Sequence, residues 1–125
     1  MVILDTNVVI DHLRQDPSLS RLIAFSKDHP EDLLGMSIIS VQELYQGKST
    51  LEENKENVLL ATINSLQLLP YTYEVSELAG KIARDLAFPI EFADAAIAAT
   101  AIMSSAKLLT LNHKHFENIS DLHLI

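Results

Sequence analysis

Three acidic residues and one amide lie at positions where α/β proteins commonly have catalytic or ligand-binding residues. Asp5 follows the apolar run of residues 1–4, which predicts a strand buried on both faces, and Asn112 follows a later predicted strand. Glu43 and Asp94 lie in the first turns of two predicted helices. Ligands bind at the carboxyl ends of strands in open parallel sheets. We therefore expect the four side chains to converge at one edge of a sheet.

Carboxylates that converge in this way need a cation, because like charges crowded together repel each other. Oxygen ligands suit hard cations, and Mg²⁺ or Mn²⁺ commonly takes one or two carboxylates while leaving positions open for phosphate oxygens. Such an ion activates a bound water and stabilises the leaving oxygen of a phosphoryl displacement. We expect Asp5 and Asp94 to be direct ligands, with Glu43 bound to the metal directly or through water.

Each of these residues also has a purely structural explanation. Asp5 and Asn112 are good helix caps, and the spacing of Ser40 and Glu43 fits a capping box, in which the acid reaches back to the backbone N–H of the capping residue. Asp94 would complement a helix dipole, although its apolar surroundings make an unpaired charge costly. The metal hypothesis therefore depends on all four residues meeting at one place.

The rest of the chain is predicted to form strands that alternate with helices. Apolar runs predict strands at residues 1–4, 33–38, 66–69, 107–110 and 122–125. Stripes at helical spacing predict helices between them, of which residues 75–86 are the most regular and the alanine-rich residues 90–104 the most apolar. Other predicted helices cover residues 5–13, the segment after Pro17, the segment that opens at Ser40, and residues 59–66. This alternation predicts one α/β domain, residues 1–125, with a mainly parallel sheet of four to five strands covered on both faces.

Composition limits the partners. The chain has 125 residues, no cysteine, and a net charge of −8 from 9 basic and 17 acidic residues. No apolar run approaches the roughly 20 residues that span a bilayer, and no basic segment precedes the first one, so we expect a cytoplasmic protein with no membrane partner. The basic residues do not cluster, which argues against ordinary nucleic-acid binding. A bound cation would restore attraction for phosphate locally.

Four stretches resemble the successive motifs of a known family. Residues 4–10 (LDTNVVI), 40–44 (SVQEL), 94–101 (DAAIAATA) and 109–116 (LTLNHKHF) look like the motifs of PIN domains, most of all those of VapC-type toxins from bacterial toxin–antitoxin pairs. The resemblance implies a PIN-like three-layer α/β/α sandwich and a Mg²⁺- or Mn²⁺-dependent ribonuclease that cuts within RNA. It also implies a homodimer and a small cognate antitoxin that inhibits it.

The resemblance also assigns roles to single residues. Asp5, Glu43 and Asp94 match the acidic metal-binding residues of the family. Asn112 falls where many members have a fourth Asp, although Asn is familiar there, and His115 stands where an acid is frequent. Asn112 is therefore expected to join the catalytic set, while the fourth motif departs from the common pattern.

Two other functions fit parts of the pattern. An acid after a buried first strand also suits a phosphatase or phosphotransferase in which Asp5 is the nucleophile, as in haloacid-dehalogenase-like enzymes. Those enzymes typically carry the motif Asp-x-Asp at this point, whereas this chain has Asn7 in place of the second Asp. The other alternative is a non-catalytic PIN-like module that only binds a partner.

Overall fold

The computed structural model describes all residues from 1 to 125 and is built on one five-stranded parallel sheet. The strand order is β3-β2-β1-β4-β5. The strands are β1 (Val2–Leu4), β2 (Leu34–Ser37), β3 (Gln67–Leu69), β4 (Lys107–Leu109) and β5 (His123–Leu124). Because all pairs are parallel, the carboxyl ends of the strands share one edge of the sheet.

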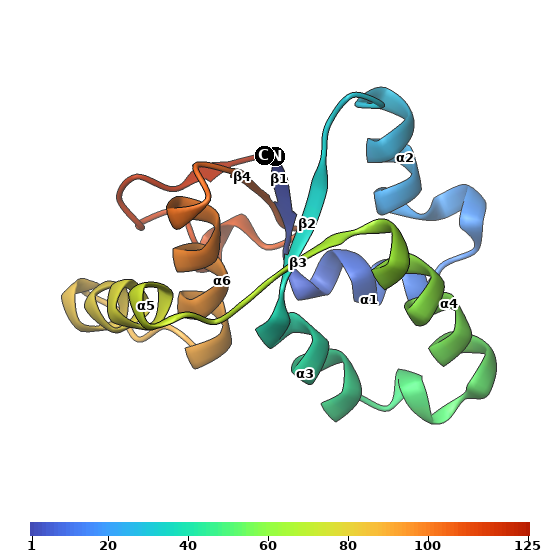
Figure 1. Ribbon diagram of the computed structural model, residues 1–125, viewed down its shortest axis with the longest axis horizontal. Coiled ribbons are helices and arrows are strands. Elements are labelled where there is room, and N and C mark those ends of the chain that lie inside the picture. Colours follow the sequence, from blue (N-terminus) through green and yellow to red (C-terminus); the bar gives the residue numbers. More distant parts are fainter.

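Helices cover both faces of the sheet, so the predicted three-layer sandwich is confirmed. Figure 1 shows α1 to α4 on one side of the strands, and α5 and α6 on the other. None of these helices is both long enough and apolar enough to cross a membrane. The helices are α1 (Thr6–Arg14), α2 (Arg21–Asp28), α3 (Ile38–Gln46), α4 (Glu53–Ser65), α5 (Tyr73–Asp85) and α6 (Phe92–Met103), with 3₁₀ turns η1 (Pro17–Leu19), η2 (Ser49–Leu51) and η3 (His113–His115).

The first strand divides the core in two because neighbouring side chains of a strand point to opposite faces. Ile3 is buried with Ile97 of α6 in one hydrophobic cluster, while Leu4 is buried with Val8 of α1 in another. Residues 95–101 of the alanine-rich helix α6 are all buried, as its composition predicted, whereas Phe92 and Met103 at its two ends are exposed. Small side chains there let the helix lie close to the sheet, which fixes the position of the acid in its first turn.

The helix after β2 begins earlier than the sequence predicted. Ser37 caps α3 by accepting a hydrogen bond from the backbone N–H of Ile39 at 3.1 Å, so the expected capping box at Ser40 is wrong. Ser40 lies inside the helix and is buried. The side chain of Glu43 is consequently free to reach a residue of another element.

The segment after α1 forms two short elements, where the sequence predicted one helix. Asp16 caps only the 3₁₀ turn η1, through a 3.0 Å bond from the backbone N–H of Ser18. Ser20 then caps a separate helix, α2, by accepting from the backbone N–H of Ile23. Two capping residues four positions apart favour two short elements over one continuous helix. The other helices start within two residues of the predicted positions, except α4, which starts six residues earlier, at Glu53; no candidate site residue leaves its element.

Two adjacent leucines of α4 test which face of this helix enters the core. Leu59 is 0% exposed, whereas Leu60 is 44% exposed. We expect Leu59→Ala to lower the free energy of unfolding by roughly 2–5 kcal/mol, because it removes buried methyl groups and leaves a cavity. Leu60→Ala, the matched control, is expected to change it by less than about 1 kcal/mol. Urea denaturation measures both values, and equal losses would contradict this packing.

Candidate active site

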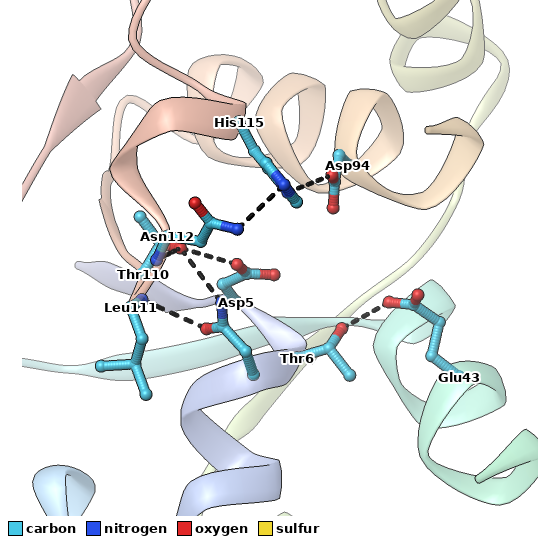
Figure 2. Close-up of polar contacts among 9 residues, drawn as sticks. Asp5, Thr6, Glu43, Asp94, Thr110, Leu111, Asn112 and His115 are labelled. Carbon is cyan, nitrogen blue, oxygen red and sulfur yellow. Dashed lines mark hydrogen bonds and ion pairs between the residues drawn. The ribbon is translucent and has the colours of Figure 1, made fainter. Parts of the chain in front are cut away.

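Asp5 lies directly after the central strand, and the residue is only 5% exposed. The register that pairs Leu4 with Leu109 brings Thr110, the residue after β4, beside it. Thr110 Oγ1 donates a hydrogen bond of 2.7 Å to Asp5 Oδ2 (Figure 2). Asp5 occupies the capping position of α1, yet its side chain makes no capping bond to that helix. Capping is therefore not what the carboxylate does.

Glu43 is turned toward the start of α1. Thr6 Oγ1 lies 2.6 Å from Glu43 Oε1 and 2.9 Å from Ser40 Oγ. Because a carboxylate only accepts hydrogen bonds, the Thr6 hydroxyl donates to Glu43 and accepts from Ser40. Thr6, the residue that follows Asp5, thus holds the acid of α3 near the end of β1.

Asp94 projects from the first turn of α6 and its side chain is 16% exposed. His115 Nδ1, from η3, lies 3.1 Å from Asp94 Oδ2. The other ring nitrogen, Nε2, lies 2.9 Å from Asn112 Nδ2. The apolar setting of Asp94 is thus relieved by a side chain from the fourth motif (Figure 2).

All four residues singled out in the sequence line one cleft of about 700 Å³ at the carboxyl edge of the sheet. Sequence reasoning did not find Thr110, although it follows β4 as Asp5 follows β1. It also missed the partners of the acids, namely Thr6 for Glu43 and His115 for Asp94. The other polar residues of the cleft are Thr6, Asn7, Gln42, Gln46, Glu91 and His115.

Burial in the cleft disfavours the ionised form of two of its carboxyl groups. Burial raises the pKa of Asp5 from its ordinary value of 3.8 to about 6; the Thr110 hydrogen bond offsets part of this effect, and the charges of Asp94 and Glu43 add to it. Burial also raises the pKa of Asp94, against the opposing effect of His115. Two carboxyl groups that resist ionisation in one cleft would be relieved by a cation between them.

The donor chemistry fits a hard divalent cation, because the acids offer only oxygen ligands. Asp5 and Asp94 face the same cleft. Glu43 is held by Thr6, and no three acidic or histidine side chains lie close enough together to share one ion in this arrangement. The residues therefore fit the ion in donor type, and Asp5 and Asp94 are two acids of the cleft whose charges act on each other.

The sequence profile of the PIN domain family matches residues 2–122. This chain belongs to the PIN domain family. It is similar to Ribonuclease VapC19 of Mycobacterium tuberculosis, with 30% identity over 98% of this chain and 97% of that protein. The family predicted from the four sequence motifs is thus confirmed.

Solved structures support the same family. The complex VapBC2 from Rickettsia felis, bound to a DNA fragment from its promoter, contains a chain that matches with a TM-score of 0.83 and 25% identity, over 100% of this chain and 98% of that chain. VapBC-1 from nontypeable Haemophilus influenzae gives 0.81 and 29%, over 100% and 97%. Because neither the matched family nor these relatives are phosphatases, the aspartyl-phosphate alternative finds no support.

Replacing Asp5 with Asn tests the charge of this buried group. The folded PIN domain holds the Asp5 proton more tightly than the unfolded chain, so the free energy of unfolding falls as the pH rises from 3.8 to about 6. Above that range the full penalty, about 3 kcal/mol, applies. We therefore expect the metal-free Asp5→Asn variant to be more stable than the parent at pH 7.5, by up to this amount, and to lose most of the advantage at pH 4.

Urea denaturation with a chelator present, at both pH values, measures this difference. Asp32→Asn removes an exposed acid from the turn before β2 and serves as the control, which should follow the parent. An advantage of Asp5→Asn that does not change with pH would contradict the raised pKa.

Proposed function

We propose that this PIN domain is the toxin of a toxin–antitoxin pair and acts as an endoribonuclease that hydrolyses RNA phosphodiester bonds in the cytoplasm. The observation that carries the proposal is the meeting of Asp5, Glu43 and Asp94, from three separate segments, in one cleft at the carboxyl edge of the sheet. The similarity to a protein named Ribonuclease VapC19 supports RNA as the substrate.

The cation in this proposal is Mg²⁺ or Mn²⁺, held by Asp5 and Asp94, with Glu43 binding it directly or through water. When bound, such an ion activates water and stabilises the leaving oxygen of the phosphodiester. Glu43 Oε1 is engaged by Thr6, which leaves Oε2 to accept a hydrogen bond from the attacking water and orient it. Asn112, the fourth predicted catalytic residue, also lines the cleft, and its side-chain amide is hydrogen-bonded to His115.

Three helix N-termini help an acidic protein to bind phosphate here. Thr6, Ile39 and Phe92, from the first turns of α1, α3 and α6, all line the cleft. Helix N-termini carry partial positive charge and unpaired N–H groups, which attract phosphate oxygens. This local field, together with a cation, opposes the net charge of −8 where the substrate would lie.

The partners in this proposal are a cognate antitoxin and a second copy of the chain. Two of the similar solved structures are VapBC complexes, which supports a protein partner of the antitoxin type. A homodimer would extend the surface available to a polymeric substrate beyond one cleft, because an RNA strand continues for several nucleotides on either side of the scissile bond.

Substitution of the two aspartates tests the proposed chemistry. We expect Asp5→Asn and Asp94→Asn each to lower the rate of RNA cleavage by roughly 100-fold or more, because an amide is a weaker metal ligand than a carboxylate. Single-turnover cleavage of a labelled single-stranded RNA with Mn²⁺ measures the rate, and circular dichroism checks the fold. Asp32→Asn is the control that should keep the parent rate. Parent-like cleavage by both site variants would show that the assigned site is wrong.

Metal binding can be tested without RNA. Millimolar Mn²⁺ should raise the melting temperature of the parent, because an ion that binds only the folded state stabilises it by roughly 2.7 kcal/mol when present at 100 times its Kd. Asp5→Asn should show a much smaller rise, and Asp32→Asn the same rise as the parent. Thermal denaturation with and without Mn²⁺ measures the shifts. A full rise in Asp5→Asn would remove Asp5 from the ligand set, and no rise or cleavage in the parent would favour a non-catalytic binding module.

A further inference from the structure

A continuous path of hydrogen bonds connects Asp5 with Asp94 through the fourth motif. Thr110 Oγ1 donates to Asp5 Oδ2 at 2.7 Å and accepts from the backbone N–H of Asn112 at 3.0 Å. The side chain of Asn112 then contacts His115, and His115 contacts Asp94. Figure 2 shows this path along the upper side of the site, from the end of β1 to the first turn of α6.

The contacts of the His115 ring fix both its orientation and its proton. Asn112 Nδ2 carries only donors and lies 2.9 Å from Nε2, so Nε2 accepts this hydrogen bond and the proton that the ring donates is on Nδ1. Nδ1 donates it to Asp94 Oδ2, 3.1 Å away. A ring that is 53% exposed has little packing to hold it, so these two hydrogen bonds determine where it points.

Only one oxygen of Asp94 is used in this path. Its other oxygen has no hydrogen-bond partner in the protein and points away from His115 in Figure 2. A carboxylate held through one oxygen cannot rotate freely, so its second oxygen is presented in a fixed direction. In metal sites, partners that hold a ligand from behind in this way commonly determine affinity.

We propose that Asn112 and His115 are positioning residues, which hold Asp94 so that its free oxygen is presented to the divalent cation. They act through Asp94 and do not bind the ion. Neither an amide nor an imidazole carries negative charge, so the two residues hold the ligand without adding to the negative charge of a cleft where the charge of Asp94 already raises the pKa of Asp5. This inference rests on the proposed metal-dependent function, because it presupposes that Asp94 is a ligand.

Two substitutions of His115 separate the contact with Asp94 from the mere presence of a polar side chain. The amide nitrogen of Asn can occupy the place of Nδ1, whereas the longer Gln places its amide near Nε2. His115→Asn should therefore keep a donor for Asp94, and His115→Gln should lose it. We expect the Kd for Mn²⁺ to rise by roughly 10- to 100-fold in His115→Gln and by less than about threefold in His115→Asn. His123→Gln, at an exposed histidine of β5, is the control and should match the parent.

Titration of RNA-free protein with Mn²⁺, following the free ion by electron paramagnetic resonance, measures each Kd. A parent-like Kd in His115→Gln, or an equal loss in both His115 variants, would overturn the positioning role while leaving the proposed function intact. Failure of the parent itself to bind Mn²⁺ would overturn the proposed function as well.

A double-mutant cycle tests whether Asn112 acts through His115. Asn112→Ala removes the amide but keeps the backbone N–H that bonds to Thr110. We expect this variant to weaken Mn²⁺ binding less than His115→Gln does, and to add nothing further in the His115→Gln background. Additive losses would show that Asn112 acts on the ion independently, as a ligand would, and would overturn this part of the proposal.

Discussion

The burial of one carboxylate at the end of the central strand is the constraint on which the rest of the site depends. Asp5 has neighbours on both sides because β1 lies between β2 and β4 in the sheet. An ionised carboxylate at this depth needs donors, and the hydroxyl of Thr110 supplies one across the β1–β4 pair. The same hydroxyl accepts from the backbone of Asn112. The hydroxyl that makes the charge of Asp5 tolerable therefore also holds the segment that leads to His115 in η3.

The convergence of the acids could be predicted because it follows from sheet geometry and not from any particular contact. In a parallel sheet, every strand end and every following helix start lies on one edge, whatever the order of the strands. Asp5 and Asn112 follow strands and Asp94 lies in the first turn of a helix, which was enough to place these three at one edge. Glu43 was also predicted in a first turn but lies further along α3, which begins at Ile38, and it still lines the cleft. The fold was predictable for the same reason, since alternating strands and helices leave few other arrangements.

The pairing of side chains within the cleft could not be predicted from the sequence. Thr6 and Glu43 are separated by 37 positions, Thr110 and Asp5 by 105, and His115 and Asp94 by 21. Local patterns say nothing about such distances and can mislead. Ser40 and Glu43 satisfy the capping-box pattern, yet both turn to Thr6, because Ser37 already caps the helix. The tertiary contact uses the same two side chains that the local motif would use, and only the three-dimensional structure decides between them.

Net charge and local charge answer different questions in this molecule. Composition argued against a nucleic-acid partner, and at long range a charge of −8 does oppose the approach of RNA. Beyond about one Debye length, however, salt screens most of that repulsion. Within the cleft the decisive groups are the helix N-termini and carboxylates whose pKa values are raised by burial, so that a cation there gains more from the site than it would from exposed acids. An acidic exterior would therefore lower the rate at which a nucleic acid approaches, while the groups at the sheet edge determine which ions and phosphates the cleft could hold.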